Sequence, residues 1–286
     1  MFRVAVRSSL LLLGFCTTFP HFITAQESDS LPRWTDKAEM SFVLTSGNSE
    51  SSSLGVRNTL TRDFHSSTIR LDAGGIRVES GTITRTAVGT GQADFTITEQ
   101  TDRETTAENY FAELRFDHEL SERTYVYSSG GWIRNRFSGI DNLWMGAAGF
   151  GVNLVSSDRS TFDVDLGATV ANEDRIIGAS ETFGGLRLTW EYKRQVTETA
   201  EFLSHLVVDE SLSDTDDLRA EFDNSIGVAI SNVLALKTGL KILFDNQPAL
   251  EEVDLFNAPG GPVIGSVLTP LNEVDTQVTV SLVVSL

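Results

Sequence analysis

The sequence has little cysteine, proline or positive charge, and each shortage excludes a class of protein. Its single cysteine, Cys16, lies in the first 25 residues, which we expect to be removed, so the remainder can form no disulfide and no thiol-based site. Its 22 Lys and Arg face 40 Asp and Glu, a net charge of −18, so binding to nucleic acid is not expected. Only 6 residues are proline, and long stretches rich in Thr, Ser, Val and Leu favour strands over helices.

The first segment has the pattern of an export signal. Arg3 and Arg7 precede an apolar stretch over residues 8–19. This stretch is shorter than the roughly 20 residues that a membrane-spanning helix needs. We therefore predict a signal peptide over residues 1–25, cleaved after Ala25.

Acylation of the chain as a lipoprotein is not expected, because the bulky Phe15 stands directly before Cys16. Cleavage removes two arginines and lowers the net charge from −18 to −20. Residues 26–33 are polar and are expected to form a short periplasmic lead, followed by one domain over residues 34–286.

The rest of the chain repeats an alternation of apolar and polar residues with a period of two. At the C-terminus, Val274, Val278 and Val280 share one phase, and Asp275 and Gln277 share the other. This period indicates strands with one apolar face. Segments of roughly 9 to 14 residues are long for a soluble sheet and suit tilted membrane strands. The twelve segments are residues 36–46, 52–64, 67–80, 107–120, 123–136, 142–155, 160–172, 181–195, 199–210, 217–231, 233–245 and 274–286.

The connections between these segments sort by length. In a barrel with both termini in the periplasm, every second turn lies on the same, short-looped side. The tight connections are at residues 65–66, 121–122, 156–159, 196–198 and 232. Both long connections, residues 81–106 and 246–273, fall on the opposite side, and the Pro-Gly run at 259–262 marks the second as irregular. We expect both to be extracellular loops.

These patterns predict an all-β fold, a transmembrane antiparallel up-and-down β-barrel of about twelve strands. Lipid cannot satisfy backbone N–H and C=O groups, so a sheet survives there only by closing on itself, with apolar residues facing outward. The second face of the strands carries charges of both signs, too many to bury without water. The candidate lumen-lining residues are Glu113, Arg115, Asp117, Arg187, Glu191, Lys193, Arg219, Glu221, Asp223, Lys237 and Lys241.

Aromatic residues are expected toward the strand ends, where amphipathic rings favour the membrane interface. They are Trp34, Tyr110, Tyr125, Tyr127, Trp144, Trp190 and Tyr192. An alternative is a β-sandwich with these rings in its core. A lipocalin-like soluble barrel would reverse the two faces, but it needs only about eight strands and leaves the remaining length unexplained.

Three groups of residues resemble a known family. They are Trp34 with Ser46, Gly47, Asn48 and Ser49; Phe137, Ser138, Gly139, Ile140 and Asp141 with Gly146, Gly149 and Gly151; and Asp245, Asn246, Gln247 and Pro248 ahead of Asp275. Through these residues the sequence, from Trp34 to Leu286, resembles the salt-induced outer membrane protein family, outer-membrane β-barrels with a domain of unknown function. The resemblance implies the fold and the compartment but hardly any activity. One departure is the terminal Leu286, where such barrels commonly end in an aromatic residue that the assembly machinery reads.

Catalytic chemistry finds little support. His65 lies in a turn, His118 in the outward phase and His205 in the inward phase, and neither metal spacing nor a nucleophile motif occurs. An outer-membrane hydrolase remains a third alternative. Its acids would be Asp209, Glu210, Asp214, Asp216 and Asp217. No catalytic, cofactor-binding or metal residues are assigned.

Two other clusters have ordinary explanations. Gly146, Gly149 and Gly151 resemble a phosphate loop only faintly, since Leu154 stands where a third glycine belongs, and are expected to allow close packing or curvature. The acids Glu251, Glu252 and Asp254 could bind calcium, or bridge lipopolysaccharide through divalent cations. A solvated loop is the simpler interpretation.

The favoured function is a narrow pore or an envelope-stabilising barrel in which lumen charges set permeability. The alternative is a non-conducting barrel whose long loops bind a surface ligand or partner. Expected partners are outer-membrane lipid and lipopolysaccharide, the barrel-assembly machinery during insertion, and small ions or solutes. No cofactor is expected.

Overall fold

A computed structural model describes residues 33–45, 50–91, 94–259 and 261–285. The expected signal peptide over residues 1–25, nearly all of the lead and the motif at residues 46–49 lie outside the described residues, as does Leu286. Within the described part, no helix is long and apolar enough to cross a bilayer.

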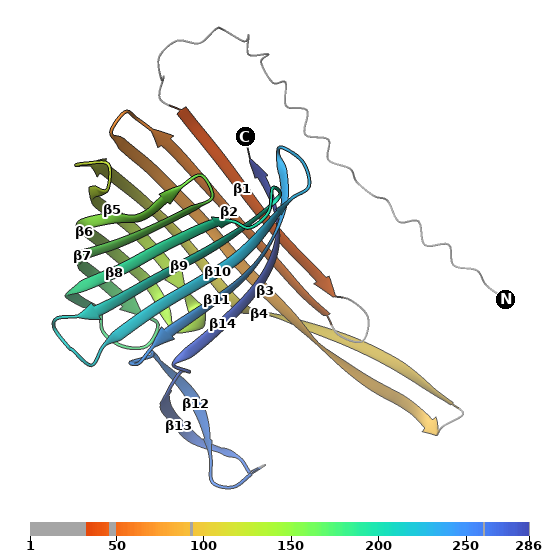
Figure 1. Cartoon of the computed structure of the whole chain (residues 1–286). Helices are drawn as coiled ribbons and strands as arrows, with labels where there is room; N and C mark the ends of the chain where they lie inside the picture. The colour runs from red at the N-terminus through yellow and green to blue at the C-terminus, as the bar shows by residue number, and fades with distance from the viewer. Residues whose placement is uncertain (1–32, 46–49, 92–93, 260, 286) are drawn as a thin grey trace. The chain divides into compact units, whose positions relative to one another are not determined.

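Twelve strands form a closed antiparallel barrel (Figure 1). The barrel strands are β1 (Arg33–Thr45), β2 (Glu50–Asp63), β3 (Ser67–Gly91), β4 (Asp94–Glu119), β5 (Thr124–Asn135), β6 (Ile140–Ser157), β7 (Ser160–Arg175), β8 (Glu181–Gln195), β9 (Ala200–Ser211), β10 (Leu218–Ala229), β11 (Leu234–Asp245) and β14 (Val274–Ser285). Each strand up to β11 pairs with its predecessor, and β14 pairs with both β11 and β1. This is the up-and-down barrel that the alternating pattern predicts.

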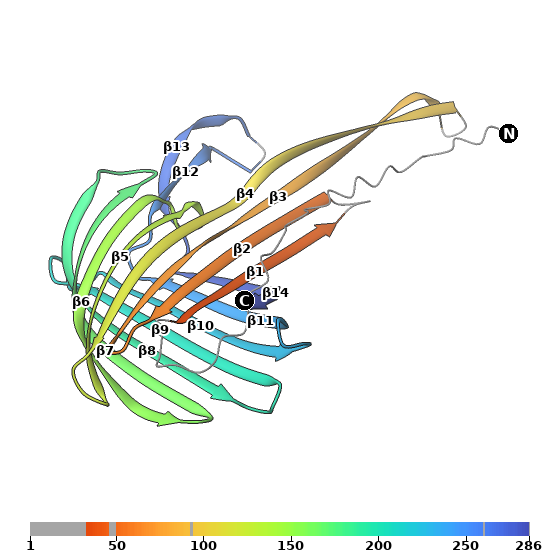
Figure 2. The same cartoon turned by 90° about the horizontal axis from the view of Figure 1, so that it is seen from above.

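The long connections contain regular structure where loops were expected. β3 and β4 remain paired as far as Gly91↔Asp94, well beyond the wall of the barrel (Figure 2). β12 (Leu250–Phe256) and β13 (Val263–Pro270) form a separate two-stranded sheet between β11 and β14. Apolar and polar residues alternate in parts of these segments too, but their position between the barrel strands predicts loops. Backbone pairing within a hairpin needs no membrane and no core, only two adjacent extended segments.

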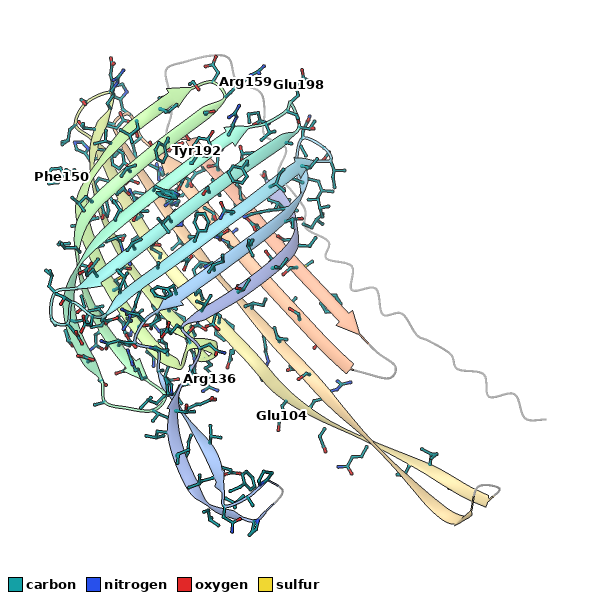
Figure 3. The ribbon with its side chains drawn as sticks, turned by 60° about the horizontal axis from the view of Figure 1, so that its bottom comes forward. Glu104, Arg136, Phe150, Arg159, Tyr192 and Glu198 are labelled. Carbon is teal, nitrogen blue, oxygen red and sulfur yellow. The ribbon has the colours of Figure 1, made fainter. Side chains whose placement is uncertain are left out.

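The connections define two ends of the barrel. The end with the tight turns after β2, β4, β6, β8 and β10 is called the turn end; the opposite end, with the β3–β4 extension and the β12–β13 hairpin, is called the loop end. Figure 3 shows Arg159 and Glu198 at the turn end, and Glu104 and Arg136 at the loop end. The predicted sorting of connection lengths is therefore present in the fold.

The wall is apolar outside. Phe150 projects away from the barrel in Figure 3 and is 68% exposed, and Leu166 is 61% exposed. Among the described residues no large side chain is fully buried, whereas Asp165 and Glu173 are only 4% and 2% exposed. A soluble protein buries apolar side chains and exposes charged ones. The reversed distribution is that of a barrel whose solvent is hydrocarbon.

Candidate functional site: the lumen and its loop-end mouth

An ion pair spans the lumen near the turn end. Arg70 Nη1 donates a hydrogen bond to Glu191 Oε2 over 3.3 Å. Arg70 is on β3 and Glu191 on β8, with β4, β5, β6 and β7 between them by the shorter way around the barrel. Two side chains so far apart around the wall meet only by reaching across the interior. The pair therefore narrows the lumen.

A second ion pair crosses the lumen at a similar height. Arg115 Nη1 on β4 lies 2.8 Å from Asp165 Oδ2 on β7, although β5 and β6 separate the two strands. Arg115 Nε also donates to Asp117 Oδ1 over 2.9 Å. The hydroxyl of Tyr125 donates to Asp165, and the Arg115 guanidinium lies 4.5 Å from the centre of the Tyr127 ring. Every charge in this group has a partner, which offsets the cost of removing it from water.

Further ion pairs continue around the interior. Two join strands that are not neighbours: Lys237 Nζ on β11 donates to Glu39 Oε1 on β1 over 2.8 Å, and Arg219 on β10 donates to Glu173 on β7. Three join neighbouring strands: Arg57 with Asp72, Arg187 with Asp209 and Lys241 with Glu221. We call the four pairs between non-neighbouring strands, Arg70–Glu191, Arg115–Asp165, Lys237–Glu39 and Arg219–Glu173, the cross-lumen ion pairs.

All eleven candidate lumen-lining residues occupy the strand phase opposite to the exposed apolar side chains. Eight of them make ion pairs named above: Arg115, Asp117, Arg187, Glu191, Arg219, Glu221, Lys237 and Lys241. Lys193 Nζ lies 3.1 Å from Glu201 Oε2 on the neighbouring β9. For Glu113 and Asp223 no ion pair is described. Contact with water along a solute path stays a prediction for the whole set.

Seven partners in these pairs were missed by sequence reasoning. They are Glu39, Arg57, Arg70, Asp72, Asp165, Glu173 and Glu201. Asp209, the partner of Arg187, is predicted only as an acid of the hydrolase alternative. Each of these residues lies in the inward phase of its strand, so strict alternation could have found them. Their pairing across the barrel could not have been found, because it depends on how the sheet closes.

The expected aromatic belt is wrong at two positions. Tyr125 and Tyr127 face the interior, where Tyr125 bonds Asp165 and Tyr127 is 4% exposed. Glycines of β6 and β7 make room for both rings. A Cβ at Gly151 would collide with the Tyr125 ring, and one at Gly167 with the Tyr127 hydroxyl. Trp34 and Trp144 are exposed on the outer wall, as expected.

The mouth at the loop end is crossed by the turn between β5 and β6. This turn contains η1 (Arg136–Ser138) and Gly139, whose φ is +71°. Ser138 Oγ donates to Asp275 Oδ2 on β14 over 3.1 Å, and the backbone N–H of Ile176 donates to the carbonyl of Gly139 over 2.9 Å. A Cβ at Gly139 would collide with Ala249, which is 2% exposed. The turn is thus packed against segments from the other side of the mouth.

The same mouth gathers the other motif residues. Asn246 Oδ1 accepts a hydrogen bond from the backbone N–H of Leu218, and Gln247 Nε2 donates to Asp214 Oδ2 over 3.1 Å. A pocket of about 440 Å³ lies here. Its lining residues are Arg175, Asn246, Gln247, Pro248, Leu250, Pro270, Leu271 and Glu273. Two of the three sequence segments that carry the resemblance therefore meet at one place in the structure.

A family model described as "Protein of unknown function, DUF481" matches residues 38–286. The chain belongs to this family. An uncharacterized protein of Escherichia coli (strain K12), YdiY, is 23% identical over 145 residues, which are 51% of this chain and 56% of that protein. The match thus spans little more than half of the relative. The resemblance inferred from the motifs of the DUF481 chain is confirmed.

Solved structures similar to the DUF481 barrel include the NanC porin, at 7% identity and a TM-score of 0.47 over 87% of this chain and 98% of that one. The translocator domain of the autotransporter NalP from Neisseria meningitidis is 11% identical, with a TM-score of 0.42 over 90% and 89% of the two chains. The KdgM porin is 6% identical, with a TM-score of 0.39 over 89% and 99%. Such distant likeness says nothing of solute or selectivity.

The histidines of the DUF481 barrel do not come together. His65 lies in the turn after β2, and His118 is exposed outside, where its Nδ1 lies 2.8 Å from Ser67 Oγ. His205 is in the opposite, inward phase, next to Glu191 on β8. Among the described residues no group of three His, Cys, Asp or Glu side chains could hold a metal. Of the three acids in the calcium alternative, Glu252 and Asp254 share one face of β12 and Glu251 lies on the other, so the three form no single cluster.

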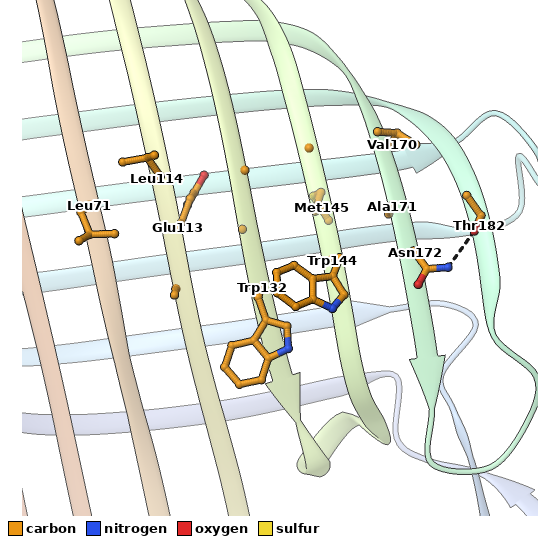
Figure 4. Close-up of a pocket in the computed structure, with 14 residues that line it drawn as sticks. Leu71, Glu113, Leu114, Trp132, Trp144, Met145, Val170, Ala171, Asn172 and Thr182 are labelled. Atoms are coloured by element: carbon orange, nitrogen blue, oxygen red, sulfur yellow. Dashed lines mark hydrogen bonds between the residues drawn. The ribbon is translucent and has the colours of Figure 1, made fainter.

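The outer wall of the DUF481 barrel is hollowed over β5 and β6, with a volume of about 650 Å³ (Figure 4). Its floor is Gly130 and Gly146, which face each other on β5 and β6. Trp132 and Trp144 border it, with their ring centroids 6.3 Å apart. The glycines are strand residues, as expected, and no phosphate loop is formed. The lining is almost entirely apolar, with Glu113 as its charged residue.

Proposed function

We propose that this protein is a narrow pore of the Gram-negative outer membrane whose lumen is restricted by ion pairs. The observation that carries the proposal is the Arg70–Glu191 pair, which reaches across the interior at 3.3 Å. A lumen divided by such a pair leaves room for ions or small polar solutes and excludes larger ones. Charges of both signs on the wall predict weak selectivity between anions and cations.

The ion pairs also stabilise the barrel. Each cross-lumen pair joins two strands that share no backbone hydrogen bonds. Opening the lumen therefore requires separating charges that are mostly buried in three of the pairs and 36% exposed in Arg70–Glu191. The proposal therefore joins the two parts of the favoured function, because the groups that restrict the pore are the ones that stabilise it. A catalytic role is not proposed.

The test is conductance after reconstitution of the purified protein into planar bilayers. Wild type is expected to show small, steady channels, and R70A channels of several-fold higher conductance. The matched control is R62A: Arg62 lies on β2 beside Ile69, and its guanidinium is stacked outside over the Trp34 ring at 4.8 Å. R62A should leave conductance unchanged. Silence of both wild type and R70A at all voltages would exclude a pore.

A second candidate is a barrel that binds a partner through its loop-end hairpins. The β12–β13 hairpin exposes Val253, Leu255, Phe256, Val263, Ile264 and Leu268. An apolar surface on the extracellular side favours a protein or lipid partner over open solvent. Deletion of residues 250–270 should then abolish partner capture while leaving conductance intact.

We further propose export through a cleaved signal peptide and insertion by the barrel-assembly machinery, with lipid and lipopolysaccharide around the wall. N-terminal sequencing of protein extracted from outer membranes checks the cleavage site after Ala25. Slower migration of the boiled form on a detergent gel checks the barrel. A chain that stays in the periplasm would contradict insertion, and one that keeps residues 1–25 would contradict cleavage.

A further inference from the structure

The barrel closes through a short seam. β1 pairs with β2 along its whole length, and β14 pairs with β11 from Val274 to Val284. Between β1 and β14, however, the register within the described residues runs only from Lys37↔Ser285 to Met40↔Leu282. Residues 41–45 of β1 and 274–281 of β14 are therefore paired on one side only. In Figures 1 and 2 the two ribbons diverge toward the loop end.

Such edges are costly in a membrane. Hydrocarbon offers no hydrogen bonds to unpaired backbone N–H and C=O groups, and each unsatisfied group costs several kcal/mol. The two edges must therefore face water from the lumen, or polar groups of a guest molecule, and not lipid chains alone.

Two contacts hold the seam in this shape. Lys237 Nζ reaches under β14 to Glu39, 2.8 Å away, beside the last paired rung at Met40. At the other end of β14, Ser138 of the mouth turn holds Asp275 over 3.1 Å. The first contact ties β11 to β1 across β14 near the turn end. The second fastens the start of β14 to the mouth turn, away from β1.

The chemistry of the open stretch differs from that of the rest of the interior. Outward, it presents Phe42, 61% exposed, and Val278, 69% exposed. In the opposite phase β14 presents Asp275, which Ser138 holds, and then Gln277, Thr279 and Ser281, which are polar and uncharged. The inward face of β14 from Gln277 onward thus has no charge, unlike the inward faces of β7, β8 and β10. An uncharged polar group could pass here without breaking an ion pair.

We propose that the stretch between β1 and β14 is a lateral portal through which a single-chain amphiphile with an uncharged polar head moves between the lumen and the membrane. The head would bond the free backbone edges and the hydroxyls of β14, and the chain would lie against Phe42 and Val278. This goes beyond a pore along the barrel axis, and it does not require axial conduction.

Cross-linking tests the open seam. If pairing continued from Met40↔Leu282, Thr45 would face Gln277, within the Cα separation of about 4.4 to 6.8 Å that a disulfide spans. The double variant T45C/Q277C is expected not to form a disulfide on oxidation in liposomes. The matched control is S129C/A147C, two register partners on β5 and β6, which should form one completely. Equal cross-linking of both variants, each shown to fold by its gel shift, would overturn the portal.

A photoreactive probe tests passage itself. Wild-type protein in liposomes is irradiated with a diazirine-bearing monoacylglycerol, and the labelled peptides are mapped by mass spectrometry. Label is expected on Gln277 and Thr279 as well as on the outer residues Phe42 and Val278. Bridging the T45C/Q277C variant with a bismaleimide should remove the inner label and keep the outer one. Label confined to the outer residues of wild type would overturn the proposal, whatever the conductance.

Discussion

Arg115 and Asp165 face each other across the lumen, 2.8 Å apart, with side chains only 14% and 6% exposed. Removing one partner of such a pair leaves a buried charge without compensation, which costs roughly 3–5 kcal/mol. We expect R115A to lower the free energy of unfolding, measured by urea titration in liposomes, by about that amount. R62A, which removes an arginine from the outer wall, should lower it by much less. Equal losses would mean that the ion pair is not what stabilises the lumen.

Gly167 lies where the Tyr127 hydroxyl and the backbone of β6 approach the strand. A Cβ there would come within 2.6 Å of the Ala148 carbonyl oxygen. Overpacking of this kind costs about 1–3 kcal/mol, and G167A should lose that much stability in the same titration. Gly227, with nothing within 4 Å of its Cβ position, provides the control G227A. If G167A and G227A have the same free energy of unfolding, the groups around Gly167 move aside more easily than their packing indicates.

Leu166 and Leu212 are equally exposed, at 61% and 63%, but only Leu166 lies on a barrel strand. Arginine facing lipid at the middle of the membrane costs about 2–4 kcal/mol, and one in water almost nothing. L166R should therefore impair insertion, measured as the folded fraction on a detergent gel, while L212R behaves as wild type. Normal insertion of L166R would place this wall in water.

Asp214 belongs to the loop between β9 and β10, outside the strands. Hydrogen bonds from the Gln247 side chain and from the backbone N–H of Asp216 lower the pKa of its carboxyl group. Because the pKa is lower in the folded state, these contacts favour the folded loop above the ordinary pKa of an aspartate. That contribution is lost as the pH falls through the lowered value.

The variant Q247A should raise the pKa of Asp214 toward its ordinary value, as measured by NMR titration of the carboxyl carbon in micelles. Q277A, which changes a glutamine of β14 remote from this loop, is the control and should leave the pKa in place. An unchanged value in Q247A would show that Gln247 does not reach Asp214 in solution.

Ser138 connects the mouth turn to Asp275 on β14, and its loss should loosen the mouth. We expect S138A to increase the frequency of channel opening in planar bilayers, with the conductance of each channel kept, because the Arg70–Glu191 pair is untouched. S128A, on the outer wall of the preceding strand β5, is the control. Unaltered opening in S138A would mean that the turn covers the mouth without restricting it.

The alternation along single strands could be interpreted without a structure. Val278 and Val280 on one face and Gln277 and Thr279 on the other already predict a wall between two media, and the tight turns predict the order of the strands. The sequence predicts a loop at residues 81–106, because no strand of the barrel is expected beside them, whereas β3 and β4 pair with each other there. Tyr125 and Tyr127 were placed at the interface by residue type, although their phase on β5 points inward.

The amino-acid sequence alone determined a closed sheet with one apolar face, through its period of two and the short turns at every second connection. In lipid a sheet satisfies all its backbone hydrogen bonds only by closing. Which charges meet was decided by tertiary structure alone. Arg70 and Glu191 are 121 residues apart in the chain, and Ser138 and Asp275 are 137 apart. Closure of the sheet brings each pair together, and closure depends on the stagger of all twelve strands at once.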